Sequence, residues 1–556
     1  MKKTKFISML MVFILMLSTM SFVACSTPSD EPSGGDGGTK TVLAIGNRNR
    51  GFGHVWIDEV AKEFELAYAD YQGEDGKVGV EVEITNKVDE FNTTNLTQNM
   101  PYNGYDLYIL DELDYNVLYT AQYEGASVLA DITDIVTEKN YDNDGNLLDK
   151  GPKSISDRMI PEYRDYYDLD ASEEKSKFYA IPFAVYPGSG IYDADLFDQK
   201  GLYFKADGTI GAKQRDIDNG NCGKGPDGEL GTYDDGMPAT WEQFKELLYD
   251  MAYNKGVTPF MWSGNNNYPK EDFSGSVYAN YEGANNYDLL YTLNGIHTKY
   301  GPIDNANAWQ LGNQEGRLAA VRAFADIMSD TKYFSSKAMA ITTTHTMAQM
   351  LYVKSIQEGT PIAMFMEGSY WEEEAREWFD DMEDTNPEWG FGKRNFKILP
   401  IPSFKGTELK TGVVSQQEDN RQVMVMQNST HSSVVISAQA QQMDLAKEFI
   451  KFMHSRQMLV RSTQIGSFLR PYDYEFTPDE KLECTKFMQS ILTMMEDKNT
   501  DIVWGCGIRS GRIESEVTKF KYWFKFDPTS YFYLQNPSID MVLGQFGNYS
   551  EETWNK

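Results

Sequence analysis

Aromatic rings lie beside carboxylate, amide and guanidinium groups at several separate points of this 556-residue chain. A flat ring can cover the C–H face of a polar solute, while the charged and amide groups hydrogen-bond its hydroxyls. The pattern predicts a binding site for a polyhydroxylated molecule. The candidate residues are Asn47, Arg48, Arg50, Asp111, Glu112, Trp262, Asn265, Glu367, Tyr370, Trp371 and Trp504.

Each candidate also has a structural interpretation. Asp111 and Glu112 could form a charge pair at the start of a helix, where negative charge complements the helix dipole. Arg48 and Arg50 could form surface ion pairs, although an acidic substrate would favour their use in binding. Trp371 precedes Trp378 by two turns of one expected helix, so packing is a plausible role for both.

Recognisable catalytic motifs are absent from the sequence. The five histidines are scattered without an H-E-x-x-H pattern, and neither a G-x-S-x-G elbow nor a G-x-x-x-x-G-K-[ST] loop occurs. A glycoside hydrolase needs two carboxylates flanking the scissile bond. With 83 Asp and Glu residues such pairs are available anywhere, so their presence neither favours nor excludes that enzyme class.

Two acidic, glycine-punctuated loops are candidate calcium sites, because Ca²⁺ prefers oxygen ligands at alternate positions around a tight turn. Asp142 and Asp144 lie in the first, and Asp216 and Asp218 in the second. Neither loop completes the twelve-residue calcium pattern: counted from Asn140, position twelve is Gly151 instead of Glu. Structural Ca²⁺ therefore stands beside solvated acidic turns as an expectation, and no other cofactor is required.

The formal charge of −32 disfavours nucleic acid as a partner, since acidic surfaces repel phosphate. Three lysines followed by an apolar stretch predict a signal peptide over residues 1–24. The segment ending Phe-Val-Ala-Cys25 resembles a bacterial lipobox, which implies lipidation of Cys25, a flexible tether over 25–40 and a location on the extracellular face of a bacterial membrane. An ordinary signal peptide with a nearby cysteine is the alternative.

Three further cysteines, Cys222, Cys484 and Cys506, give no disulfide framework. Cys484 and Cys506 are the nearer pair in sequence and could oxidise outside the cell. Buried free thiols are the other interpretation.

Apolar runs at residues 41–45, 78–85 and 105–110 alternate with helical patterns, which predicts an open α/β sheet. Ligands of such sheets bind at the carboxyl ends of the strands. Residues 178–197 form an apolar stretch that Pro187-Gly-Ser-Gly190 interrupts. We expect this stretch to be the first crossing between two lobes, with Pro187–Gly190 flexing at the back of a cleft.

Seven segments, in this order, resemble the extracellular solute-binding lipoproteins of carbohydrate ABC importers, of maltodextrin-binding type. They are KFYAIP (177–182), IYDADLF (191–197), PATWEQF (238–244), AMFMEGSYW (363–371), LPIP (399–402), AKEFIKF (446–452) and QIGSFLRP (464–471). The resemblance implies a two-lobed periplasmic-binding-protein-like fold, each lobe an open α/β sheet, with about three crossings. It places residues 41–184 plus 432–472 in one lobe and 185–431 plus 473–556 in the other.

The same resemblance implies that a carbohydrate binds between the lobes and is delivered to the permease subunits of an importer, without chemistry. A monomer held to the membrane only by its lipid is expected. A secreted glycoside hydrolase and a surface glycan-binding adhesin are the alternatives. The sugar, its length and its linkage stay open, and so does another polar solute such as a peptide.

Overall fold

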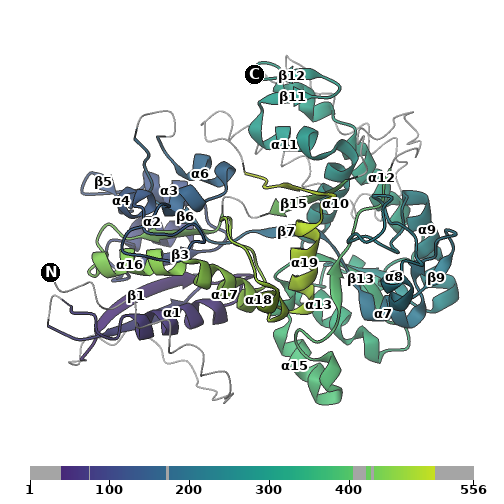
Figure 1. The fold of residues 1–556 in the computed structure, drawn as a ribbon, viewed down its shortest axis with the longest axis horizontal. Coiled ribbons are helices and arrows are strands. Elements are labelled where there is room, and N and C mark those ends of the chain that lie inside the picture. Colours follow the sequence, from purple (N-terminus) through teal and green to yellow (C-terminus); the bar gives the residue numbers. More distant parts are fainter. Residues whose placement is uncertain (1–38, 74–75, 171–174, 405–420, 428–430, 507–556) are drawn as a thin grey trace.

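The computed structural model describes residues 39–73, 76–170, 175–404, 421–427 and 431–506. Within them the chain forms two α/β lobes, which lie left and right in Figure 1. The predicted two-lobed fold is confirmed. Cys25, the signal peptide and nearly all of the tether lie outside the described residues. No helix in the described ranges is both long and apolar enough to span a membrane.

The first lobe is built around a mixed sheet with the strand order β2-β1-β3-β16-β6. β1 runs parallel to β2 and β3, whereas β16 runs antiparallel to β3 and β6. All four residues of β3 are buried, as expected for a strand covered on both faces. The strands are β1 (Thr41–Arg48), β2 (Val80–Asn86), β3 (Leu107–Leu110), β6 (Ile181–Pro182) and β16 (Ser433–Ile436).

Helices of the first lobe come from both ends of the described chain. Trp56, Val60 and Phe64 form the buried face of α1, and the Phe64 ring lies 5.0 Å from that of Phe449 in α16. A segment that follows the second lobe in sequence therefore completes the first. The helices are α1 (Val55–Ala67), α2 (Thr93–Asn99), α3 (Tyr115–Thr120), α4 (Thr133–Thr137), α5 (Ile155–Arg158), α6 (Pro161–Tyr167), α16 (Met443–Met453) and α17 (Arg456–Gly466).

The second lobe has a sheet with the order β10-β13-β7-β15-β17, and β14 also pairs with β7. β7 is antiparallel to β13, β14 and β15, while the pairs β10–β13 and β15–β17 are parallel. The strands are β7 (Tyr186–Asp193), β10 (Thr258–Met261), β13 (Ile362–Gly368), β14 (Phe396–Ile398), β15 (Gln422–Gln427) and β17 (Thr500–Val503).

The predicted interruption at Pro187–Gly190 is wrong, because these residues belong to the continuous strand β7. The two glycines allow helix α10 to lie close to the sheet. A Cβ added at Gly188 would lie 3.0 Å from the Cβ of Asp272, and one at Gly190 would lie 3.4 Å from the Phe273 ring. The segment therefore serves helix–sheet packing instead of bending.

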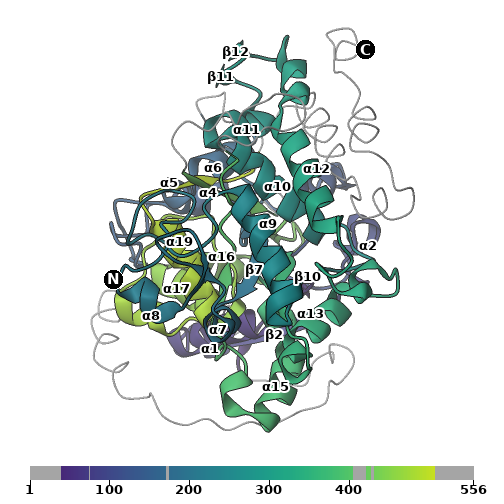
Figure 2. The ribbon, with the colours of Figure 1, turned by 90° about the vertical axis from the view of Figure 1, so that its right-hand side faces the viewer.

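Helix α10 packs against β7, β13 and β15, and α12 runs beside it (Figures 1 and 2). Nearly every residue of α10 is buried, so it is a core helix of this lobe. The helices here are α7 (Ala194–Lys200), α8 (Gln214–Asp218), α9 (Trp241–Asp250), α10 (Tyr268–Glu282), α11 (Ala284–Thr292), α12 (Gly316–Met328), α13 (His345–Lys354), α14 (Trp371–Glu374), α15 (Arg376–Thr385), α18 (Pro478–Leu482) and α19 (Lys486–Glu496).

Three crossings join the lobes, as predicted. The first runs between β6 and β7 and hydrogen-bonds both others: Phe183 N donates to Ser432 O over 3.0 Å, and Val185 and Leu469 exchange two bonds of 2.9 Å. The second joins β15 to β16, with residues 428–430 outside the described ranges. The third follows α17 and leads through α18 to α19. Residues 183–185, next to Pro187–Gly190, form the first link.

Candidate functional site

Strands of both sheets end at the contact between the lobes. In the first lobe β1 ends at Arg48 and β3 at Leu110; in the second β13 ends at Gly368 and β17 at Val503. We call the facing residues the lobe junction. It comprises Arg50, Gly51, Phe52, Asp111, Glu112, Glu162 and Tyr163 of the first lobe and Tyr268, Asp272, Asp288, His345, Glu367, Tyr370, Glu374 and Trp504 of the second, with Tyr186 at the link.

Asp111 holds the first-lobe side of the junction in place. Its Oδ2 accepts a hydrogen bond from Gly51 N over 3.2 Å, and its Oδ1 accepts one from Ser432 Oγ over 2.9 Å. It is 4% exposed. Asp111 therefore ties the loop after β1 to the loop after β3 and to the second crossing, which is a positioning role.

Arg48 and Asn47 are likewise committed to their own lobe. Arg48 Nε donates to Asp111 O over 2.9 Å, and burial lowers the pKa of its guanidinium. Asn47 Nδ2 donates to Asn86 Oδ1 over 2.7 Å. Both side chains are buried and are hydrogen-bonded within the first lobe.

Arg50 and Glu112 form a half-exposed ion pair of 2.9 Å that faces the second lobe. Both charges act on His345, whose pKa burial lowers. His345 Nε2 lies 3.9 Å from Glu374 Oε1, and burial raises the pKa of Glu374 well above its usual range. Charged groups of both lobes therefore meet at this end of the junction.

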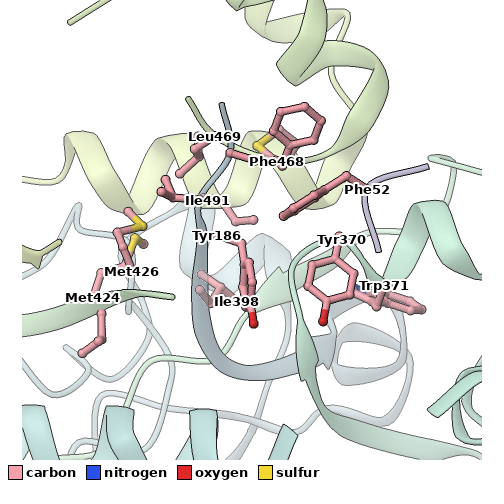
Figure 3. Packing of buried hydrophobic residues seen from close by; sticks show 14 of the residues in the cluster. Phe52, Tyr186, Tyr370, Trp371, Ile398, Met424, Met426, Phe468, Leu469 and Ile491 are labelled. Carbon is pink, nitrogen blue, oxygen red and sulfur yellow. The ribbon is translucent and has the colours of Figure 1, made fainter. Parts of the chain in front are cut away.

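Aromatic rings join the lobes at the centre. The Phe52 ring of the first lobe lies 5.3 Å from the Tyr370 ring and 6.3 Å from the Tyr186 ring. Figure 3 shows Phe52 above Tyr186 and Tyr370, whose hydroxyls point away from it into the second lobe. A Cβ added at Gly51 would lie 2.7 Å from the Tyr370 ring, so the backbone also approaches closely.

Two buried carboxyl groups lie on the second-lobe side. Glu367 is 1% exposed; Gly368 N donates to its Oε1 over 3.0 Å, and the Tyr268 hydroxyl also hydrogen-bonds it. Asp272 is 7% exposed and hydrogen-bonds Tyr186. Within the described part of the chain, Glu367 Oε2 and Asp272 Oδ2 have no hydrogen-bond partner.

Burial shifts the titration of both groups, because a charged carboxylate is poorly solvated inside a protein. It raises the pKa of Glu367 to about 8, with Asp272 adding to the effect. It also raises the pKa of Asp272 well above its usual range, with Glu271 contributing. Burial therefore favours the protonated form of both groups, and Glu367 is mainly protonated at neutral pH.

At the other end of the junction Tyr163 of α6 meets Trp504. The Tyr163 hydroxyl donates to Trp504 O over 3.3 Å, and the two rings lie 6.2 Å apart, edge to face. Nearby, Glu162 of α6 acts on Asp288 of α11. Burial and this second carboxylate raise the pKa of Asp288 to about 6.

Two of the predicted ligand-contacting rings are core residues instead. Trp371 is fully buried among the rings of Tyr352, Phe365, Phe379, Phe396 and Phe487. Trp262 is fully buried against Phe324 and Phe334. Asn265 is exposed, and its backbone N donates to Thr343 O. Neighbouring Tyr370 is the ring that reaches the junction.

Sequence reasoning missed several junction residues. Tyr163, Asp272, Asp288 and His345 lie in or at the start of helices, and Tyr186 begins β7. None follows a predicted strand, so the rule about strand ends does not select them. Buried polar positions in an otherwise apolar helix, such as Asp272 in α10, are the one available signal.

The carboxylates expected to bind calcium have other roles. Asp142 accepts hydrogen bonds from the backbone of Asp144 and from Asn146, which closes a turn. Asp216 caps α8 by accepting from Lys213 N, and Asp218 accepts from Gln214. Over the described ranges no group of three or more His, Cys, Asp or Glu side chains is arranged to hold a metal ion. Structural calcium at these loops stays a prediction.

The cysteines Cys222, Cys484 and Cys506 are all buried, and no disulfide bond joins them. Burial raises the pKa of the Cys484 thiol to about 12, so it is protonated at neutral pH. Their burial agrees with packing and not with a disulfide framework.

No family model matches the chain, and no curated protein is similar to it in sequence. Solved structures are similar. A chitin oligosaccharide binding protein matches with a TM-score of 0.51 and 12% identity, over 93% of this chain and 99% of its own. A protein from work on xylan utilization by Caldanaerobius polysaccharolyticus matches with a TM-score of 0.50 and 13% identity, over 88% and 97%. The chain therefore shares the two-lobed α/β fold of these structures.

Proposed function

We propose that the protein captures a carbohydrate between its lobes and delivers it to the membrane permease of an ABC importer. One observation carries the proposal: hydrogen-bonding oxygens of Asp272 and Glu367 are left unpaired beside aromatic rings at the lobe junction. Buried polar groups normally have partners, so unpaired ones at the contact between two lobes favour a ligand there. Similarity to a chitin oligosaccharide binding protein supports a carbohydrate ligand.

The lobes are joined in a way that suits capture and release. Three crossings link them, and at the junction centre the described contacts are mainly between rings, such as Phe52 on Tyr370. Ring contacts can part and reform without breaking strong hydrogen bonds. We infer that the lobes open to admit the sugar and close on it, and that the closed form is what the permease recognises.

The remaining parts of the proposal follow from the sequence. Lipidation of Cys25 would hold the protein on the extracellular face of the membrane, with residues 26–40 as the tether. The protein would act as a monomer, and the ATPase of the importer would be a different chain. Mass spectrometry of the membrane fraction, which should detect a lipid on Cys25, tests this part.

A thermal-shift screen of the mature protein against mono- and oligosaccharides tests the central claim, since a bound ligand raises the melting temperature by mass action. Small-angle scattering with a hit should show a smaller radius of gyration. The Asp272→Asn variant should lose affinity, whereas Asp380→Asn on the exposed face of α15 should not.

The same experiments distinguish the alternatives. Conversion of a hit into shorter products would identify a glycoside hydrolase. Binding without compaction would favour a rigid adhesin. Absence of any carbohydrate hit, together with a shift caused by peptides, would contradict the proposal.

A further inference from the structure

Carboxyl groups from both lobes dominate the described part of the lobe junction. Asp111, Glu112 and Glu162 belong to the first lobe, and the second lobe adds the rest. The second-lobe members are Asp272, Asp288, Glu367 and Glu374.

The arginines of the junction do not balance this charge. Arg50 is paired with Glu112, and the Arg48 guanidinium donates to the backbone carbonyls of Asp111 and Val88. Burial also lowers the pKa of His345, so this imidazole is neutral at neutral pH. Asp288, whose pKa is about 6, is mainly ionised at neutral pH, so a negatively charged ligand would meet repulsion there.

Asp272 and Glu367 are the two groups best placed to meet a cation. Both are more than nine-tenths buried, and each has one oxygen without a hydrogen-bond partner among the described residues. Glu271 acts on Asp272, and both Asp272 and Glu374 interact with Glu367; all three are carboxyl groups, and the buried Lys270 lies on the same helix as Asp272. Besides these groups, the Tyr186 hydroxyl faces Asp272 and the Tyr268 hydroxyl faces Glu367.

We propose that the junction selects a carbohydrate that carries a protonated amine, an amino sugar, and rejects acidic sugars. This inference rests on the proposed function. An ammonium group supplies hydrogen-bond donors for Asp272 Oδ2 and Glu367 Oε2, and charge-assisted bonds of this kind are stronger than neutral ones. A neutral sugar would offer only hydroxyls to the same atoms.

Binding of such a ligand is coupled to proton release. Glu367 and Asp272 are held protonated by burial, so each must give its proton to solvent to pair with an ammonium. Glu374 lies close enough to Glu367 for the two charges to act on each other, and Tyr370 also faces both. We expect the affinity for the amino sugar to rise with pH over the range in which its amine stays protonated.

Matched sugars that differ in one group test the proposal. The panel contains oligosaccharides of glucosamine, N-acetylglucosamine, glucose and glucuronic acid with the same linkage, together with an array of other amino, neutral and acidic glycans. Calorimetry in two buffers of different ionisation enthalpy should show release of about one proton or more per amino sugar bound near pH 7. The amino form should bind about ten-fold more tightly than its neutral counterpart.

Variants separate charge recognition from loss of folding. Glu367→Gln and Asp272→Asn should each reduce the affinity for the amino form roughly ten-fold more than the affinity for the neutral form. Glu377→Gln, on the exposed face of α15, is the control and should change neither affinity.

The outcomes are distinct. Tight binding of neutral or acidic sugars with no proton release would overturn the amino-sugar inference and leave the proposed function standing. Failure of every carbohydrate on the array would overturn both.

Discussion

The two faces of the lobe junction differ in how their polar groups are used. On the first-lobe face, Asp111 accepts hydrogen bonds from Gly51 and Ser432, and Arg48 donates to backbone carbonyls. On the second-lobe face, Asp272 and Glu367 keep unpaired oxygens within the described chain. The first face is a rigid frame, and the second retains the hydrogen-bonding capacity that a ligand can use.

This difference has an energetic consequence. Paired buried groups stabilise the lobe that contains them, whereas an unpaired buried carboxyl costs stability whenever it would otherwise ionise. A binding protein can carry that cost where the ligand later supplies the partner. The following changes test the contrast between the faces.

The largest expected effect concerns Glu367 and pH. Its pKa of about 8 lies above the ordinary value of 4.5, so between these pH values the unfolded chain holds it ionised and the folded chain protonated. Stability is therefore lost as the pH rises from 4.5 to about 8, by up to roughly 4–5 kcal/mol. Relative to the wild type, Glu367→Gln should gain stability at about pH 8 compared with about pH 5.

Urea unfolding at the two pH values measures this difference. The exposed Glu377→Gln variant should follow the wild type at both. If Glu367→Gln keeps the wild-type pH dependence, the second-lobe face does not hold a strained carboxyl.

Asp111→Ala should lower the free energy of unfolding by about 2–3 kcal/mol, because two donors lose a buried acceptor. Its neighbour Glu112 is the matched control: Glu112→Ala removes a half-exposed ion pair and should cost less than about 1 kcal/mol. Chemical denaturation measures both. If the two variants lose the same free energy of unfolding, the buried Asp111 holds the first-lobe face no more firmly than the half-exposed Glu112.

Gly51→Ala should separate the faces with little change in stability. The new Cβ would lie 2.7 Å from the Tyr370 ring of the opposite lobe, so the loop and the ring must move apart. Scattering should report a larger radius of gyration for the unliganded variant. The double change Gly51→Ala with Tyr370→Ala removes the obstacle and should restore the wild-type value; if it does not, the contact does not control lobe spacing.

The smallest expected effect is at the far end of the junction. Tyr163→Phe removes the hydroxyl that donates to Trp504 O over 3.3 Å and should weaken ligand binding by no more than about 1 kcal/mol. Exposed Tyr249→Phe serves as the control. Calorimetry measures the ligand affinity of both variants. If Tyr163→Phe loses 100-fold or more in affinity, about 2.7 kcal/mol, both faces contribute equally to binding.

Much of the fold could be predicted because its signals are local. The alternation of apolar residues over 78–85 and the apolar run at 105–110 do form strands, β2 and β3. Thr240 caps α9 by accepting a hydrogen bond from Gln243 N over 3.3 Å, a contact between near neighbours in sequence. The number of crossings came from the resemblance of seven segments to solute-binding lipoproteins and not from a local pattern.

The site was predicted less well because the residue type of an aromatic side chain does not show whether its ring lies in the core or at the junction. Trp371 and Tyr370 are adjacent and equally aromatic, yet Trp371 is enclosed by five rings and Tyr370 meets Phe52 of the other lobe. The glycines of Pro187–Gly190 led to a wrong prediction of a break for a related reason. Gly188 reads as a break, but a strand beside a tightly packed helix also needs a residue without a side chain.

The sequence by itself determined the strands, the capped helices and the lobed α/β architecture, since hydrophobic periodicity and capping chemistry act over a few residues. Only the tertiary structure decided which polar groups form hydrogen bonds within the protein and which keep an unpaired oxygen. Asp111 found donors in Gly51 and in Ser432, which lies 321 positions away, whereas Asp272 and Glu367 kept free oxygens within the described chain. Hydrogen-bond partners so distant in sequence are brought together only by folding.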